Sequence, residues 1–274
     1  MITNSKLLID LDCTMCKLYG KAFLKLGLIE KDVLSSYQQI EKSISDSIDM
    51  ERAKSEIALI NLKNNQVEYG IDAFTRILTK EKSIPRALIR IQPFRLLFKL
   101  LYSIISWNRH IITRPASTCS SPICTPDLHL GYRITYNLIT ALLTGFILSN
   151  YFSSLFLSSG IVLPTFFEYV VCFGQIFFQG TIVTAIDKEK AWDYLGHMST
   201  ISMIGALLLL PPYVIAGILG LSSIYLLGAF GLVVIIMIQE HILRSKRLGL
   251  GHTLTATWVF YRMLILLFIL ILSL

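Results

Sequence analysis

Long apolar stretches fill the second half of the chain. From Ile134 onward, five stretches of about 20 residues carry few or no charged side chains. A helix of about 20 apolar residues is long enough to cross roughly 30 Å of hydrocarbon. The pattern therefore predicts an all-α membrane bundle of about five transmembrane helices, at residues 134–157, 161–186, 198–218, 221–240 and 255–274. Pro211 and Pro212 either bend the third helix or form the turn after it.

Shorter apolar runs alternate with polar turns in the first 83 residues. The run from Lys6 to Asp12 is typical of a short buried strand, and apolar residues recur at helical spacing from Thr14 to Leu28. Further along, the pattern predicts helices at 48–53 and 72–79 and strands at 57–62 and 66–69, with a turn at 63–65 between the strands. This alternation indicates a small α/β domain.

A connector joins these two parts. Residues 94–107 are strongly apolar and follow several basic residues, which predicts a helix on the α/β domain or, as the alternative, on an anionic membrane surface. Residues 113–127 are rich in Ser, Thr and Pro, which is typical of a loop. We therefore expect three parts: an α/β domain at 1–112, a juxtamembrane linker at 113–133 and a helical membrane domain at 134–274.

Composition and charge support this organisation. A hydrophobic fraction of 54% and a mean hydropathy of +0.62 are too high for a chain that is soluble throughout. The net charge of +7 is concentrated at residues 84–133, which hold 7 Lys and Arg against 1 acidic residue. Residues 1–83 hold 12 of each sign, so this part presents no net field to phosphate. We therefore expect the lipid bilayer, and not a nucleic acid, as a partner.

The distribution of Lys and Arg also predicts an orientation. The expected loops at 158–160 and 220–222 hold none, whereas the opposite flanks of the spans hold Arg109, Arg114, Arg133, Lys188, Lys190, Arg244, Lys246 and Arg247. Basic residues collect on the cytoplasmic side of membrane proteins. Residues 1–20 do not resemble a secretory signal. We expect an integral protein of the inner (cytoplasmic) membrane with its N-terminal domain in the cytoplasm and its C-terminus outside.

The sharpest chemical signal is a pair of cysteines, Cys13 and Cys16, at the junction of the first strand and the first helix. Unpaired backbone N–H groups at a helix start lower the pKa of a nearby thiol. We therefore expect Cys13 to attack a disulfide and Cys16 to resolve the mixed disulfide. The neighbouring carboxylates Asp10 and Asp12 oppose thiolate formation, and either is a candidate proton acceptor.

The residues from Ile9 to Cys16 resemble the opening motif, Y-D-G-x-C-x-x-C, of the DCC-type thiol-disulfide oxidoreductase-like family. Residues 67–73 are similar to a later G-x-D/E-A segment of that family, and Leu101 to Arg109 are similar to its closing helix. The resemblance covers roughly residues 6–112. It implies a thioredoxin-like fold for the N-terminal domain, with Cys13 and Cys16 as its redox pair and with a protein or small-molecule thiol or disulfide as the partner.

Two other interpretations use the same residues. Residues 7–14 fit the hhhDxDxT opening of haloacid-dehalogenase-type phosphatases, in which Asp10 would attack phosphate and Asp12 would act as acid and base. Such enzymes need a further acidic pair for Mg²⁺, and we find no such segment before the first span. The other interpretation is a non-enzymatic membrane binding or scaffold protein, in which the cysteine pair is vestigial or holds zinc.

A second cysteine pair, Cys119 and Cys124, lies in the linker. It is a secondary redox candidate that could exchange electrons with Cys13 and Cys16, or a source of two further ligands for a Cys₄ zinc site. The third possibility is two loop thiols that a reducing cytosol keeps reduced. Cys172, in the second span, is predicted to be a small packing residue.

Other polar residues are candidates for further cofactor sites. The five histidines fall near the cytoplasmic ends of the spans and indicate a solvated rim or, alternatively, a metal, haem or quinone site. Within the spans, Glu168, Gln175, Gln179 and Arg262 are costly in lipid, and Arg262 is a candidate partner for Glu240. The overall prediction is a membrane-anchored thiol-disulfide oxidoreductase that needs no cofactor beyond its cysteine pair. Its helical bundle either anchors the redox domain or passes electrons to a lipid-soluble carrier in the membrane.

Overall fold

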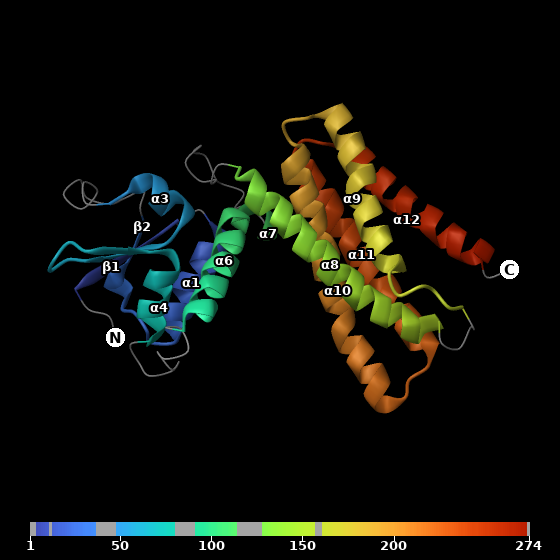
Figure 1. The fold of residues 1–274 in the computed structure, drawn as a ribbon, viewed down its shortest axis with the longest axis horizontal. Coiled ribbons are helices and arrows are strands. Elements are labelled where there is room, and N and C mark those ends of the chain that lie inside the picture. Colours follow the sequence, from blue (N-terminus) through green and yellow to red (C-terminus); the bar gives the residue numbers. More distant parts are fainter. Residues whose placement is uncertain are drawn as a thin grey trace. The chain divides into compact units, whose positions relative to one another are not determined.

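The computed structural model describes residues 4–10, 13–36, 48–79, 91–113, 128–156 and 161–272. The chain divides into two compact units, residues 1–133 and 134–274 (Figure 1). The first is a small mixed α/β unit with a four-stranded sheet, and the second consists of long apolar helices. Each unit is described separately.

The sheet of the first unit has the strand order β2-β1-β3-β4. Its strands are β1 (Ser5–Ile9), β2 (Leu34–Ser36), β3 (Ala58–Asn61) and β4 (Val67–Tyr69). Strand β1 is parallel to β2, with Leu7 opposite Leu34, and antiparallel to β3, with Leu8 opposite Ala58. Strands β3 and β4 form an antiparallel hairpin. Because β1 lies in the centre, its end is supported on both sides.

Helices cover both faces of this sheet (Figure 1). Helices α1 (Thr14–Lys25) and α4 (Gly70–Thr79) pack on the face that carries Leu7, Ile9 and Leu59, where Phe23 and Ile77 complete the core. The short helix α3 (Met50–Ser55) packs on the other face, against Leu8 and Ile60. Alternate residues of β1 thus enter two cores, as the pleat of a strand requires. The predicted α/β class and most predicted elements are confirmed.

One strand was not predicted. The 3₁₀ turn η1 (Lys31–Val33) and strand β2 follow α1, and together they complete a parallel β1-α1-β2 unit. Strand β2 is only three residues long, with the sequence Leu-Ser-Ser, and it shows no apolar alternation. Its extended conformation depends on pairing with β1, which is a tertiary effect. Strand β1 also ends at Ile9, earlier than the predicted Asp12.

Helix α6 (Gln92–Trp107) closes the first unit on the side of α4, and the short helix α7 (Arg109–Ile112) follows it. The hydroxyl of Tyr102 accepts a hydrogen bond from the backbone N–H of Ile57, at 3.1 Å, and its ring contacts Phe74. This confirms the prediction of a helix on the α/β domain. The outer side of α6 is nevertheless apolar, since Leu96 and Leu97 are 63% and 49% exposed.

The second unit contains five helices that are long and apolar enough to cross a membrane, among the residues that the structure describes. They are α8 (Leu130–Phe156), α9 (Phe167–Ile186), α10 (Ala191–Leu219), α11 (Ser223–Arg247) and α12 (Thr253–Leu272). The prediction of five long apolar helices in this part of the chain is confirmed. Pro211 and Pro212 lie inside α10, so they do not form the turn after it. Helix α10 also begins earlier than predicted, because its first turns contain the polar residues Asp193 and His197.

Close helix packing holds this unit together. A Cβ atom on Gly205 of α10 would lie 2.2 Å from the sulfur of Met237 on α11, and one on Gly174 of α9 would lie 2.4 Å from the hydroxyl of Tyr261 on α12. Small residues at such contacts allow membrane helices to approach closely. Many large apolar side chains of these helices remain exposed, as expected of surfaces that hydrocarbon covers.

Candidate functional site

The turn between β1 and α1 places Cys13 and Cys16 together. Cys13 is the residue before the first helical turn, with an extended backbone, and no side chain caps this helix end. The N–H of Cys13 donates to the carbonyl of Asp10 at 3.3 Å, which closes the turn after β1. Cys16 lies in the first turn of α1, three positions later. The unpaired N–H groups of this turn give the site a positive partial charge.

The two cysteines differ in exposure. Cys16 is 3% exposed and belongs to the core beneath the sheet, whereas Cys13 is partly exposed at its edge. Both are free thiols in this structure. A disulfide in solution can therefore approach Cys13 more readily than Cys16, which matches the predicted order of attack and resolution.

The electrostatics separate the two thiols further. A hydrogen bond from the Cys16 side chain is the main cause that lowers the pKa of Cys13 to about 6, although burial opposes it. The backbone of Cys16 and the guanidinium of Arg109 lower this pKa further. The same hydrogen bond and burial raise the pKa of Cys16. At neutral pH, Cys13 is therefore mainly thiolate and Cys16 is a thiol.

Asp10 is buried next to a positively charged side chain. Its side chain is 1% exposed, and its Oδ2 atom lies 3.6 Å from the Nη2 atom of Arg109, whose side chain is 6% exposed. A guanidinium at this position compensates the buried carboxylate. The negative charge that was expected to oppose thiolate formation at Cys13 is thus offset by Arg109.

A cavity of about 360 Å³ borders the buried member of the pair. Its wall is mainly apolar and aromatic, with Phe74, Phe98 and Leu101 beside Cys16. The polar side chains in the wall include Tyr19 and Tyr102. Burial raises the pKa of Tyr102 to about 12 and also raises the pKa of Tyr19, so both remain protonated at neutral pH. The cavity is large enough to receive an apolar side chain.

Several predicted site residues cannot be placed. Asp12, Cys119 and Cys124 lie outside the described residues, so the second cysteine pair and the acid/base role of Asp12 stay predictions. Within the described ranges, no group of three or more His, Cys, Asp or Glu side chains is arranged to hold a metal ion. Cys172 is 5% exposed inside α9, as predicted for a packing residue.

The prediction of a solvated histidine rim is wrong for two of the five histidines. His197 and His241 are 6% and 1% exposed. The ring of His241 contacts the hydroxyls of Tyr194 and Thr255, at 3.1 and 2.8 Å, and stacks on Trp258. Tyr194 in turn donates to the side chain of Gln179 at 2.8 Å. These hydrogen bonds link α9, α10, α11 and α12, as expected of a polar clamp between membrane helices.

The low pKa of Cys13 predicts an unusual alkylation profile. The thiolate persists as the pH falls until it is protonated near pH 6, so the rate of iodoacetamide alkylation should rise through pH 6 and level off above about pH 7. An ordinary cysteine, with a pKa of about 8.5, would still be gaining reactivity at pH 8. Mass spectrometry of the Cys13 peptide measures the rate. In Cys16→Ala the midpoint should move upward because the main hydrogen bond is lost; a wild-type midpoint near 8.5 would contradict the assignment.

The sequence interpretation missed Arg109 and the two tyrosines as parts of this site. From the sequence, Arg109 is assigned to the membrane flank and to the end of the segment that resembles the closing helix, and nothing local in the sequence links it to Asp10. The resemblance of residues 101–109 to the closing helix of the DCC-type family was the available signal, because it placed this segment in the same domain as the cysteines.

Comparisons with protein-family models, with curated proteins and with solved structures found no match for the chain.

Proposed function

We propose that this protein is a membrane-anchored thiol-disulfide oxidoreductase. The observation that carries the proposal is the pairing of a partly exposed Cys13, whose pKa is lowered to about 6, with the buried thiol of Cys16 at the start of α1. Strongly perturbed thiols at a helix start are typical of reactive cysteines. The phosphatase and the scaffold interpretations have no comparable observation in their favour.

In the proposed reaction, the Cys13 thiolate attacks one sulfur of a substrate disulfide. A bond forms between Cys13 and that sulfur, and the other substrate sulfur leaves as a thiolate that takes up a proton. Cys16 then loses its proton and attacks Cys13, which releases the second substrate thiol and leaves a disulfide between Cys13 and Cys16. Two electrons pass to the substrate, and a cytosolic dithiol or glutathione returns the pair to its reduced form.

Asp10 is the proposed acceptor of the Cys16 proton. Its carboxylate is buried on the same turn, and Arg109 keeps it beside the site. A buried base is useful at the second step, when Cys13 is in the mixed disulfide and no longer accepts the hydrogen bond from Cys16.

The fold supports this proposal. A parallel β1-α1-β2 unit with the cysteine pair at the β1–α1 junction, followed by an antiparallel hairpin and a helix, fits a thioredoxin-like domain of the DCC type. We assign this domain to the cytoplasm and the C-terminus to the outside. The loops at 157–166 and 220–222 contain no Lys or Arg, whereas the loop between α9 and α10 contains Lys188 and Lys190.

The cavity beside Cys16 supports an apolar substrate. Phe74, Phe98 and Leu101 offer contacts to an aromatic or aliphatic group but few to a charged one. We therefore assign as substrate a disulfide flanked by apolar groups. A hydrophilic disulfide such as oxidised glutathione is expected to react more slowly than a disulfide-bonded apolar peptide.

A redox titration of the full chain in detergent tests the proposed function. Equilibration with thiol-disulfide buffers, followed by mass spectrometry of the alkylated peptides, should give a two-electron transition for Cys13 and Cys16 that is absent in Cys13→Ser. The matched control, Cys172→Ser, should leave the transition unchanged, because Cys172 is buried in α9. Stoichiometric bound zinc that protects both cysteines, or the lack of any disulfide between them, would rule out the proposal.

A further inference from the structure

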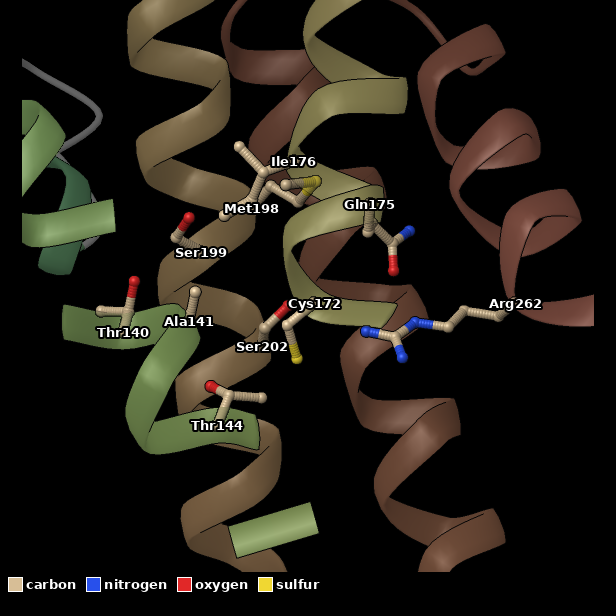
Figure 2. A pocket seen from close by; sticks show the side chains of 10 residues that line it. All are labelled: Thr140, Ala141, Thr144, Cys172, Gln175, Ile176, Met198, Ser199, Ser202 and Arg262. Atoms are coloured by element: carbon tan, nitrogen blue, oxygen red, sulfur yellow. The ribbon is translucent and has the colours of Figure 1, made fainter. Parts of the chain in front are cut away.

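A small polar pocket lies inside the second unit (Figure 2). Four helices line it, and their polar contributions are Thr140 and Thr144 of α8, Cys172 and Gln175 of α9, Ser199 and Ser202 of α10, and Arg262 of α12. These residues lie toward the middle of the candidate spans. The pocket has a volume of about 10 Å³. It is therefore large enough for about one oxygen-sized group.

Three polar atoms around this pocket lack a hydrogen-bond partner. They are the hydroxyls of Thr144 and Ser199 and the side-chain carbonyl of Gln175, which have no partner among the residues that the structure describes. The three residues are 1%, 3% and 2% exposed. An unpaired polar atom is costly in a buried place, and more so where hydrocarbon surrounds the protein. Their convergence on one pocket indicates a ligand that supplies the missing hydrogen bonds.

The guanidinium of Arg262 is also only partly compensated by neighbouring groups. The predicted partner Glu240 pairs with Arg244 of its own helix, at 3.4 Å, so that part of the prediction is wrong. Arg262 instead lies near Cys172 and Glu168, but it forms no ion pair within 4 Å among the described side chains. A guanidinium has five N–H donors. Figure 2 shows it extending from α12 toward Cys172, so donors remain available at the pocket.

A larger apolar cavity adjoins the polar pocket. It has a volume of about 340 Å³ and shares Thr144, Ser202 and Arg262 with the pocket. Its wall otherwise consists mainly of apolar residues from all five helices, and it includes Trp258, whose indole N–H has no partner within the described part of the chain. The volume lies in the range of small-molecule sites. An apolar space with one polar end fits an amphiphilic molecule.

We propose that the helical unit binds a lipid-soluble molecule whose apolar ring or chain fills the cavity and whose uncharged carbonyl or hydroxyl oxygen enters the polar pocket. Arg262 can donate to this oxygen, and the hydroxyls of Thr144 and Ser199 can donate or accept. The side-chain carbonyl of Gln175 only accepts hydrogen bonds, so an ionised carboxylate, which has no proton to donate, would leave it unpaired, whereas a hydroxyl can satisfy it. The site is independent of the thiol chemistry proposed above.

Quenching of Trp258 fluorescence tests this site in the full chain. In detergent, and with Trp107 and Trp192 replaced by Phe, three probes are titrated: a short-tailed benzoquinone, a brominated long-chain alcohol and the brominated carboxylic acid of the same length. Saturable quenching by the quinone or by the alcohol supports the proposal, and the tighter of the two identifies the head group. The acid, when ionised, should bind more weakly than the alcohol.

Matched variants separate the site from partition into the micelle. Thr144→Val and Ser199→Ala each remove one unpaired hydroxyl and should weaken binding about fivefold. Thr181→Val is the control, because Thr181 is exposed on α9 and donates to its own helix, and it should leave binding unchanged. Ala206→Leu, which extends into the cavity wall, should abolish saturation. Quenching that never saturates, equal binding by all variants, or tighter binding of the ionised acid would overturn the proposal.

Discussion

Replacement of Cys16 by serine should stop turnover after the first chemical step. Cys13 remains a nucleophile in this variant, so it attacks the substrate disulfide and releases about one thiol equivalent per chain. Without Cys16 no second thiol is released by the chain itself, and the mixed disulfide at Cys13 accumulates. Mass spectrometry of the intact protein should show one covalently bound substrate half, which dithiothreitol removes.

The reciprocal variant provides the control for this result. Cys13→Ser should trap nothing and release nothing, because Cys16 is buried and burial together with its hydrogen bond raises its pKa. A mixed disulfide on Cys16 in Cys13→Ser, or full turnover by Cys16→Ser, would reverse or remove the assigned roles. The proposed order of attack rests on the difference in exposure and pKa, so this pair of variants tests both.

Replacement of Arg109 by methionine should destabilise the first unit by about 3–5 kcal/mol. The arginine lies 3.6 Å from Asp10, and both side chains are almost fully buried. Removing one member of a buried ion pair leaves the other charge uncompensated, which costs this amount in typical proteins. The urea dependence of Cys16 alkylation, followed by mass spectrometry of its peptide, measures the change because Cys16 reacts only when the core opens.

A double variant distinguishes charge from packing in this prediction. Arg109→Met combined with Asp10→Asn removes both charges and should recover most of the lost stability. Arg109→Met should also raise the pKa of Cys13, because its guanidinium contributes to the lowering. Equal destabilisation in the single and the double variant would show that the aliphatic part of Arg109 matters and its charge does not.

The membrane part of the fold could be predicted well from sequence because the signal is local. Each span needs about 20 consecutive apolar residues, and such runs are visible without any knowledge of the neighbours. The ends of the helices were harder to predict. Helix α10 begins before the predicted start at 198, because its first turns contain the polar residues Asp193 and His197. The choice between a kink and a turn at Pro211 and Pro212 also required the structure.

The candidate site could be predicted only in part, because only some of its contacts are local in the sequence. Cys13 and Cys16 belong to one turn, so their spacing and position were readable in the sequence. Arg109 reaches the site from a distant part of the chain, and β2 becomes a strand through its pairing with β1. Contacts of this kind arise from tertiary packing, and no local pattern records them.

The pKa of Cys13 also bears on how readily the proposed pair accepts electrons. With a pKa of about 6, thiolate outnumbers thiol about tenfold at pH 7. This excess stabilises the dithiol form by at most about 1.4 kcal/mol, which corresponds to a shift of roughly 30 mV toward a less reducing couple. Reduction of the Cys13–Cys16 disulfide by the cellular thiol pool is favoured by that amount. The driving force for the reduction of each substrate disulfide is smaller by the same amount.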